Sequence, residues 1–269
     1  MSNFAIIAGG GKLPILINKF LLKNGHNVFI IGIKNNFNHT KYKFTDFEEV
    51  KIGSISRILS ILKKKNIKNI IFSGSIKRPS FRDISLDFEA IKLIKSTQID
   101  KLGDNQLFIK ISNYFAKKGF NFVEWYKYCP ELFTNEDSLT IHKPSKSANS
   151  NLNKGLNIFK YFGKLDIGQS IIIQNNIILG LESIEGTDNL IKRCFTYKRK
   201  GDKGILLKLK KINQDLRFDL PTIGLNTIKL LKKYDYEGIF IEKKYCLILD
   251  KDKVINFANK NKIFIKTLS

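Results

Sequence analysis

The sequence predicts an α/β protein with a Rossmann-like amino-terminal domain and a distinct second α/β domain. Short apolar runs alternate with amphipathic helical patterns over the first half of the chain, which is typical of a parallel sheet covered on both faces. A glycine turn, Gly9-Gly10-Gly11, follows the first apolar run. Residues 131–150 lack apolar periodicity, so we place a linker there, between domains at 1–130 and 151–269.

The elements of the first half follow from these patterns. We expect strands at the apolar runs, and helices where apolar residues recur every three or four positions. The expected strands are 3–8, 27–33, 69–73 and 121–125, and the expected helices are 13–23, 54–65, 83–94 and 105–118. Sheets of this kind bind ligands at the carboxyl ends of their strands.

The second half shows a mixed pattern that predicts a separate sheet. A turn at Asn175-Asn176 is expected to join two strands, and a hairpin is expected around Lys243-Lys244. The expected strands are 170–174, 177–182, 204–210, 238–242, 245–249 and 263–267. The expected helices are 152–162, 187–193, 226–234 and 253–260.

Composition favours a globular cytoplasmic protein. No apolar run approaches the roughly 20 residues that span a bilayer, and the first residues lack the features of an export signal. The three cysteines form neither a disulfide framework nor a zinc pattern, which is typical of a reducing cytosol.

The formal net charge of +23 is spread along the chain. Of the 47 basic residues only six are arginines, and no helix-turn-helix or aromatic-basic motif is present, so no nucleic-acid partner is expected. A diffusely basic surface still suits anionic partners, including lipid headgroups. In a chain that is rich in lysine, an arginine is the stronger indication of a phosphate contact, because its planar guanidinium group binds phosphate bidentately.

The stretch 215–224, Asp-Leu-Arg-Phe-Asp-Leu-Pro-Thr-Ile-Gly, is a loop that leads into a predicted helix. It brings acidic side chains to a helix amino terminus, where free N–H groups favour phosphate. Carboxylates beside a phosphate repel it unless a divalent cation lies between them, so the loop indicates metal-assisted phosphate chemistry. The alternative is that Asp215 and Asp219 cap helices or pair with Arg217.

Other acidic residues lie in similar loops of the second half. Glu185 and Asp188 precede or open a predicted helix, as Asp219 does, and Asp166 lies on a glycine-rich turn. Hard oxygen ligands without a thiolate or imidazole cluster favour Mg²⁺ or Mn²⁺ over zinc. Taken singly, each of these carboxylates is better explained as a cap or a surface charge than as a metal ligand.

The glycine turn does not complete a nucleotide motif. Pro14 replaces the third glycine of the dinucleotide fingerprint, and no acidic residue follows the second strand. What remains is a tight turn at a helix amino terminus that can approach a phosphate or sugar. The third strand ends in Ser73-Gly-Ser-Ile-Lys-Arg-Pro79, a loop suited to an anion or simply to solvent, and Asp104 suits an N-cap.

Together these motifs resemble one family, the UDP-2,3-diacylglucosamine pyrophosphatases of the LpxI type. The matching segments occur in the family's order along nearly the whole chain, and 214–224 is the most specific of them. They are Ala8–Pro14, Ser73–Pro79, Leu102–Asp104, Leu165–Gln169, Glu185–Asp188 and Gln214–Gly224.

The resemblance implies a Rossmann-like domain joined to a distinctive carboxyl-terminal domain, with the substrate held between them. It implies Mg²⁺-dependent hydrolysis of UDP-2,3-diacylglucosamine to UMP and 2,3-diacylglucosamine 1-phosphate (lipid X), a step of lipid A synthesis. In the family, water attacks the β-phosphate. A basic enzyme acting on an anionic lipid would also gain from peripheral attachment to the inner membrane. A homodimer is consistent with the sequence, which does not determine the oligomeric state.

Carried over by motif, the resemblance assigns roles to residues of this chain. Asp219 and Arg217 are the expected catalytic residues, and Asp219, Asp188 and Glu185 the expected metal ligands. The expected substrate-binding residues are Gly10, Gly11, Leu13, Ser73, Gly74, Arg78, Asp104, Asp166, Ile167, Gly168, Gln169, Thr187, Thr222 and Gly224.

The chain departs from the family pattern in two places. Asn105 stands where a second aspartate is frequent, and the segment 211–213 differs from the usual sequence before the central loop. A non-catalytic nucleotide or nucleic-acid binder stays an alternative, and a nicotinamide-dependent oxidoreductase is disfavoured by the incomplete fingerprint.

Overall fold

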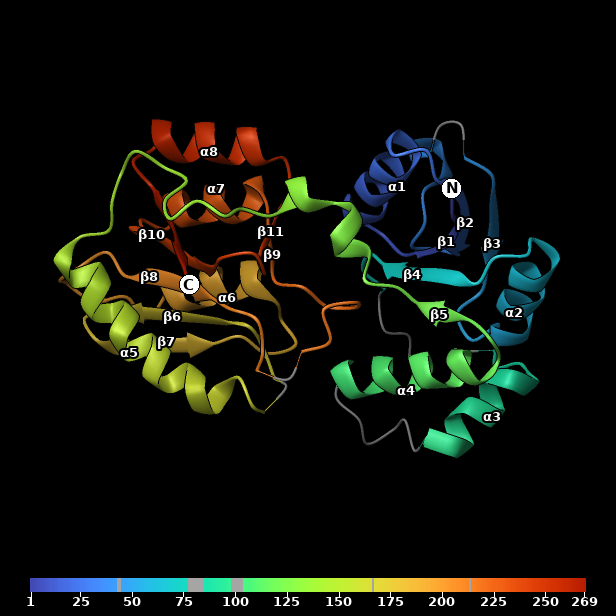
Figure 1. Ribbon diagram of the computed structural model, residues 1–269. Helices are drawn as coiled ribbons and strands as arrows, with labels where there is room; N and C mark the ends of the chain where they lie inside the picture. The colour runs from blue at the N-terminus through green and yellow to red at the C-terminus, as the bar shows by residue number, and fades with distance from the viewer. Residues whose placement is uncertain (43–44, 77–84, 98–103, 166, 213) are drawn as a thin grey trace. The chain divides into compact units, whose positions relative to one another are not determined.

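The computed structural model describes residues 1–42, 45–76, 85–97, 104–165, 167–212 and 214–269. The chain forms two compact units, each built on its own five-stranded sheet (Figure 1). Unit 1 comprises Met1–Cys129 and the short segment Asp215–Asp219, and unit 2 comprises Pro130–Gln214 and Leu220–Ser269. The predicted α/β fold class is confirmed.

The sheet of unit 1, sheet A, is entirely parallel, with strand order β3-β2-β1-β4-β5. Its strands are β1 (Asn3–Ala8), β2 (Asn27–Ile33), β3 (Phe47–Val50), β4 (Asn69–Ser73) and β5 (Asn121–Phe122). The bounds predicted for β1, β2 and β4 are confirmed. The short β3 was not predicted, and β5 ends before residue 125 because Trp125 begins a 3-10 turn (η4, Trp125–Tyr128).

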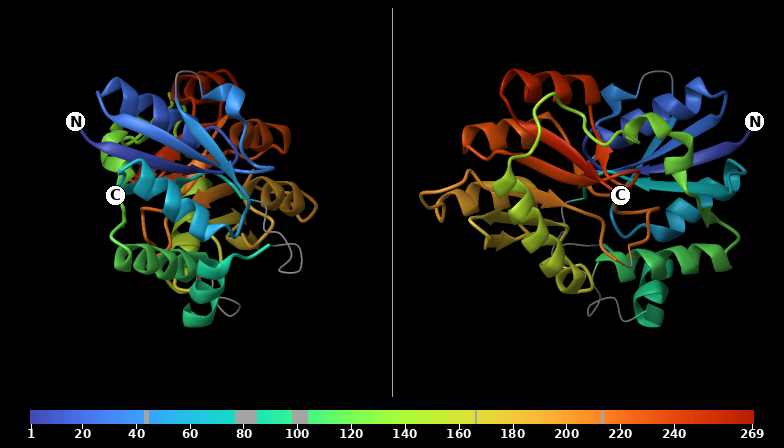
Figure 2. Two further views of the ribbon diagram at one scale, coloured as in Figure 1. Left: turned by 90° about the vertical axis from the view of Figure 1, so that its right-hand side faces the viewer. Right: turned by 60° about the vertical axis from the view of Figure 1, so that its left-hand side comes forward.

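Helices cover both faces of sheet A, as apolar strands require. One face packs against α2 (Ile55–Lys64) and α4 (Asp104–Lys117), where Ile7 and Ile31 meet Leu62 and Phe115. The helix α3 (Phe88–Thr97) packs beside α2 and α4. On the other face, α1 (Leu13–Lys23) contacts β1 and β2 (Figure 2). All four helices were predicted, with ends that shift by a few residues.

The sheet of unit 2, sheet C, has the order β12-β10-β8-β6-β7. Its strands are β6 (Ser170–Gln174), β7 (Ile177–Leu181), β8 (Ile205–Lys208), β10 (Gly238–Glu242) and β12 (Phe264–Leu268). The strands β8, β10 and β12 are mutually parallel, whereas β6 runs antiparallel to both β7 and β8. The predicted turn at Asn175-Asn176 has positive φ at both residues, as a tight hairpin requires.

The hairpin predicted around Lys243-Lys244 is wrong. The strand β10 already has β8 and β12 as parallel neighbours, so neither of its edges is open to the next segment. That segment instead forms β11 (Leu247–Ile248), which pairs in parallel with β9 (Thr222–Ile223). Period-two alternation identifies a strand but does not specify its partner.

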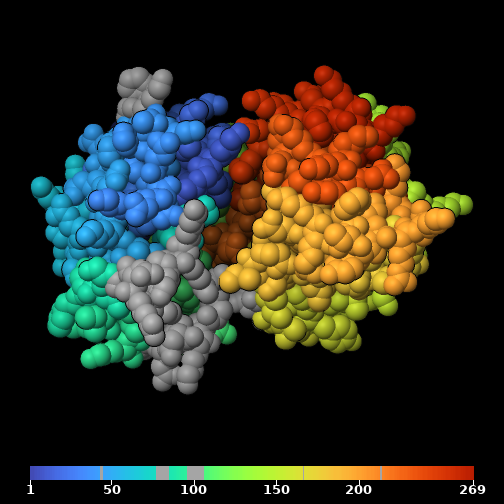
Figure 3. All heavy atoms as spheres, turned by 180° about the vertical axis from the view of Figure 1, so that it is seen from behind, coloured from blue at the N-terminus to red at the C-terminus, as the bar shows by residue number. Residues whose placement is uncertain are grey.

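Alternating residues of sheet C face two different helical layers. Ile171 and Leu207 pack with Phe159 of α5 (Lys146–Phe162) on one face. Ile172 and Leu206 face the layer of α6 (Thr187–Phe195), α7 (Leu225–Lys233) and α8 (Lys251–Lys260) on the other. The helix α7 contacts both α6 and α8, and the atoms of this part of unit 2 are amber to red in the space-filling view (Figure 3).

The segment predicted as a linker, 131–150, lies within unit 2. The N–H of Leu139 donates to the carbonyl oxygen of Ile265 at 3.0 Å, and α5 begins at Lys146 rather than near residue 152. Ser145 caps this helix, because its hydroxyl accepts a hydrogen bond from the N–H of Ala148. The polar composition of 131–150 therefore reflects a loop on the sheet and a capped helix start.

Candidate active site

The turns that follow β1 and β4 are bonded to each other. The N–H of Gly9 donates to the carbonyl oxygen of Ser73 at 2.9 Å, and the N–H of Gly10 donates to that of Ser75 at 2.8 Å. The N–H of Ser75 returns a bond to Gly10 at 3.0 Å. The predicted residues Gly10, Ser73 and Gly74 thus lie together at the carboxyl edge of sheet A, where such sheets bind ligands.

Close approach explains two of the glycines. A Cβ on Gly9 would lie 2.5 Å from the carbonyl oxygen of Ser75, and one on Gly74 would lie 2.6 Å from that of Gly10. Gly74 also has a φ of 95°. By contrast, a Cβ on Gly11 would meet nothing within 4 Å, so the turn leaves open space before α1.

The start of α1 and the end of β4 carry groups suited to a ligand. Leu13 is the first residue of the helix, directly after the glycine turn and its N-cap residue Lys12. The Ser73 hydroxyl is buried and has no hydrogen-bond partner in the part of unit 1 that the structure describes. Buried hydroxyls normally have partners, so Ser73 is the side chain at this edge best suited to bond a ligand.

The segment Asp215–Asp219 belongs to unit 1, although its neighbours in sequence belong to unit 2. Phe218 inserts between aromatic rings, with its centroid 5.2 Å from Phe108 and 5.3 Å from Phe122. The indole N–H of Trp125 donates to the carbonyl oxygen of Arg217 at 3.0 Å. Phe218 thus anchors the main chain directly before Asp219.

Arg217 forms the ion pair with Asp215 that the sequence left as an alternative. Its Nε and Nη2 donate to the two carboxylate oxygens at 2.9 and 2.6 Å, and its Nη1 donates to the carbonyl oxygen of Phe122 at 3.3 Å. Burial raises the pKa of Asp215, but the Arg217 bonds outweigh it and hold that pKa below its usual value. The guanidinium therefore has a structural partner in addition to any role toward phosphate.

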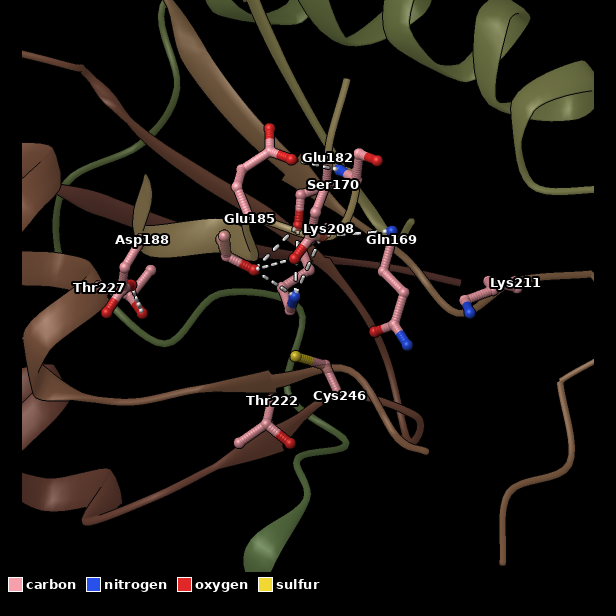
Figure 4. A network of polar contacts seen from close by, with 12 residues as sticks. Gln169, Ser170, Glu182, Glu185, Asp188, Lys208, Lys211, Thr222, Thr227 and Cys246 are labelled. Atoms are coloured by element: carbon pink, nitrogen blue, oxygen red, sulfur yellow. Dashed lines mark hydrogen bonds and ion pairs between the residues drawn. The ribbon is translucent and has the colours of Figure 1, made fainter. Parts of the chain in front are cut away.

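A buried cluster occupies the carboxyl end of β8 in unit 2 (Figure 4). The Lys208 ammonium donates to the Thr187 hydroxyl at 2.7 Å and to the Ser170 hydroxyl at 3.2 Å, and lies 3.7 Å from a Glu182 oxygen. The Thr187 hydroxyl donates in turn to Glu182 at 2.8 Å, and the N–H of Gln169 donates to the same carboxylate at 3.2 Å. The cluster thus joins Gln169 and Thr187, which were both predicted to bind substrate.

The electrostatics of the cluster keep Glu182 ionised. Burial raises its pKa, but the charge of Lys208 and hydrogen bonds from Ser170, Thr187 and the Gln169 N–H outweigh burial, so the net pKa is lowered. At the end of the neighbouring strand, burial raises the pKa of Glu242 despite the nearby Lys210. The pKa values of these two carboxylates, which lie at the same edge of sheet C, are therefore shifted in opposite directions.

The other residues predicted in unit 2 have mostly structural contacts. A Cβ on Gly168 would lie 2.2 Å from the carbonyl oxygen of Glu182, so close packing requires this glycine, and Ile167 before it is exposed. Thr222 lies in β9, and its hydroxyl donates to Leu220. Gly224 is the extended N-cap of α7.

The proposed ligands Glu185 and Asp188 both have protein partners. Glu185 accepts a hydrogen bond from Arg193 at 2.6 Å, and Asp188 accepts bonds from Asn226 and Thr227. Among the described residues, no group of three or more His, Cys, Asp or Glu side chains is arranged to hold a metal. One or two described carboxylates are sufficient for magnesium when substrate phosphates complete its shell.

The side chains of three predicted residues are not described. Arg78 and Asp166 lie outside the described residues, and Asp104 is described only as the first residue of α4. The residues that sequence reasoning missed are Lys208, Glu182 and Ser170. The one available signal was Lys208, at the end of an otherwise apolar strand. A lysine that such a strand buries is expected to have a partner, because lysine is rarely buried unpaired.

Comparison with known proteins places the chain in a family. The models for the LpxI N-terminal domain and the LpxI C-terminal domain match residues 3–132 and 135–266. The chain is 26% identical over 272 residues to the UDP-2,3-diacylglucosamine pyrophosphatase LpxI of Caulobacter vibrioides, an alignment that covers 98% of this chain and 97% of the relative.

Two solved structures resemble part of the chain at low identity. A UDP-glucose-4-epimerase from Stenotrophomonas maltophila with bound NAD and formylated UDP-arabinopyranose is 15% identical, with a TM-score of 0.31 over 45% of this chain and 35% of that one. A short chain dehydrogenase family protein from Francisella tularensis is 24% identical, with a TM-score of 0.26 over 44% of each chain. Likenesses this distant carry no argument about activity. Because the two domain models together span nearly its whole length, the chain belongs to the LpxI family.

Proposed function

We propose that the protein hydrolyses the pyrophosphate bond of UDP-2,3-diacylglucosamine, releasing UMP and 2,3-diacylglucosamine 1-phosphate for lipid A synthesis. The observation that carries this proposal is the end-to-end match to both family domains and to a relative that bears the name of this activity. The matched segments include the central loop with Asp219, which is the most specific motif of the sequence.

In this proposal Asp219 is the essential carboxylate, which orients and activates the attacking water. Support comes from its setting: Phe218 is clamped by two aromatic rings, and Trp125 and Asp215 hold Arg217. A side chain on so firmly anchored a segment is well positioned, as catalysis requires. The Arg217 guanidinium stabilises phosphate charge in the transition state, using those of its N–H groups that do not donate to Asp215.

We propose Mg²⁺ as the cofactor, with Mn²⁺ as a substitute. When bound, such an ion lowers the pKa of a water ligand and neutralises phosphate charge. Asp219 is the main candidate to hold it, and Glu185 and Asp188 are secondary because both already accept hydrogen bonds from protein groups.

In unit 1 the glycine turn and the start of α1 are proposed to bind phosphate or sugar through main-chain N–H groups, with the Ser73 hydroxyl as a further donor. In unit 2 the proposed substrate contacts are Gln169 and Thr187. Arg78, Asp104, Asp166, Ile167, Gly168, Thr222 and Gly224 complete the proposed substrate-binding residues.

We also propose peripheral attachment to a membrane surface. No helix among the described residues is long and apolar enough to cross a bilayer. The stretch 138–165 contains no acidic residue, and the exposed Lys160 and Lys164 flank Tyr161 and Leu165, which are themselves exposed. Apolar side chains beside lysines suit an anionic lipid surface. Co-sedimentation with vesicles that contain phosphatidylglycerol, but not with purely zwitterionic ones, is the expected result.

The first experiment is hydrolysis of UDP-2,3-diacylglucosamine by purified protein with Mg²⁺, with EDTA, and by the Asp219→Ala variant. We expect UMP only with metal and with intact Asp219. In ¹⁸O-labelled water the label should enter 2,3-diacylglucosamine 1-phosphate if the β-phosphate is attacked, and UMP if the α-phosphate is attacked. No UMP from the wild-type protein at any acyl length or with either metal would reject the proposal.

A further inference from the structure

We propose that Lys208 and Glu182 are positioning residues for this reaction, a role that rests on the proposed function. They form a buried ion pair that holds Gln169 and Thr187 in the geometry with which these two residues contact substrate. Neither charge touches the substrate itself in this proposal.

The pair is almost fully enclosed. The side chain of Lys208 is 5% exposed and that of Glu182 is 11% exposed. Their nearest atoms, Nζ and Oε2, are 3.7 Å apart, and most of the contact between them runs through the hydroxyls of Ser170 and Thr187. The pair is therefore the centre of a network and not an isolated bridge.

The network fixes Thr187 from two sides. Its hydroxyl accepts from Lys208 at 2.7 Å and donates to Glu182 at 2.8 Å. A threonine hydroxyl has one proton, so this donation uses its only donor and sets its rotamer. Thr187 is the first residue of α6, so the same bonds fix the start of that helix.

Gln169 is fixed by its main chain. Its N–H donates to the Glu182 carboxylate at 3.2 Å, and its carbonyl oxygen accepts from the N–H of Leu209. The main-chain N–H of Glu182 donates to Ser170, one residue further along. The loop between α5 and β6 is thereby tied to the end of β7 and to the end of β8.

Stability alone does not explain why charges occupy this place. A buried ion pair costs desolvation free energy, and apolar residues of similar volume often serve a core equally well. The neighbouring strand residues Leu207 and Ile171 are such residues. What an ammonium and a carboxylate add is directional bonding to several groups at once, and two of those groups are the predicted substrate contacts.

The test separates positioning from folding with a charge-free pair. Lys208→Met leaves Glu182 without its counter-charge, whereas Lys208→Met combined with Glu182→Gln removes both charges. Lys198→Met is the matched control, because Lys198 is another part-buried lysine of unit 2 that donates to main-chain carbonyls, at Tyr234 and Asp235. Each variant is assayed for its melting temperature and for kcat and KM on UDP-2,3-diacylglucosamine.

We expect the double variant to melt within about 4 °C of the wild type. Its kcat/KM should nevertheless fall about 10²-fold, as misplaced substrate contacts do. Most of the loss should appear in KM, because Gln169 and Thr187 are proposed to bind substrate and not to react. Lys198→Met should keep the wild-type kcat/KM.

A double variant that melts like the wild type and keeps its kcat/KM would overturn the positioning role while leaving the proposed function intact. An inactive wild-type protein would overturn both. The third outcome is that both kcat/KM and the melting temperature are low in Lys208→Met and return together toward the wild-type values in the double variant. This would show that the pair serves folding only.

Discussion

The carboxyl edges of the two sheets hold their polar groups in different ways. At sheet A the turns after β1 and β4 are joined by main-chain bonds between Gly9, Gly10, Ser73 and Ser75, with no charged side chain in the pairing. At sheet C the end of β8 carries a buried ammonium bonded to hydroxyls and a carboxylate. The edge of sheet A depends on glycines, which let the main chains approach closely, and the edge of sheet C depends on charged side chains.

This difference determines how visible each edge is in a sequence. Glycines required by close approach stand out, because few residues can replace them. A lysine at the end of a strand does not stand out in a chain with 47 basic residues. The two edges should also respond differently to substitution and to pH.

The largest effect on stability is expected at the edge of sheet C. Lys208→Met alone should lower the free energy of unfolding by about 3–5 kcal/mol, because it leaves a buried carboxylate without its counter-charge. Urea denaturation at pH 7 measures this. Lys203→Met is the control, since its ion pair with Asp235 is well exposed and should contribute little. Equal effects of the two substitutions would contradict the buried role of Lys208.

At the edge of sheet A, Gly9→Ala should lower the free energy of unfolding by about 1–3 kcal/mol. The added methyl group would lie 2.5 Å from a main-chain oxygen, which can move only if the paired turns separate. Gly224→Ala serves as control, because its methyl group would meet only Leu249 Cβ at 3.9 Å. If the two variants unfold at the same urea concentration, the close approach at Gly9 is not a constraint.

Acid should act on sheet C through Glu182. Its pKa is lower in the folded protein than in the unfolded chain, so its contribution to stability is complete above the unfolded pKa, near pH 4, and is lost as pH falls through the folded pKa. We expect the wild type to lose more stability between pH 7 and pH 3 than the double variant Lys208→Met with Glu182→Gln. Parallel pH dependence in urea titrations of the two proteins would contradict the lowered pKa.

The smallest effect on stability is expected for Ser73→Ala. The buried Ser73 hydroxyl has no partner among the described groups, so its removal should not lower the free energy of unfolding. Ser170→Ala, which removes an acceptor from Lys208, should cost about 1–2 kcal/mol. If Ser73 binds substrate as proposed, Ser73→Ala should raise KM at unchanged stability. An unchanged KM would remove it from the proposed contacts.

Much of the fold could be predicted because local pattern decides it. The strands β1, β2, β4 and β6 have the predicted bounds, since each is an apolar run with turn residues at its ends. The strand β3 was missed because its four residues include two glutamates, and pairing with β2 overrides that low propensity. The strand β11 was recognised but given the wrong partner, which depends on contacts distant in sequence.

Less of the candidate site could be predicted. The motif around Asp219 was identified as one continuous loop, but its residues 215–219 pack with unit 1 because Phe218 finds its aromatic partners there. The Arg217–Asp215 pair was foreseen only as an alternative. The convergence of Glu182, Thr187 and Lys208 was not foreseen, since Glu182 follows β7, Thr187 begins α6 and Lys208 ends β8.

By itself the sequence determined the α/β class, most helices and strands, the glycine turn and the family resemblance. The first three depend on residues close together in the sequence, and the resemblance depends on the order of motifs along the chain. Tertiary structure alone decided which strands are neighbours, where the 215–219 segment packs, and which of many lysines is buried. The physical reason is that pairing, burial and charge compensation are properties of residues brought together from distant positions, and no local window of sequence contains both partners.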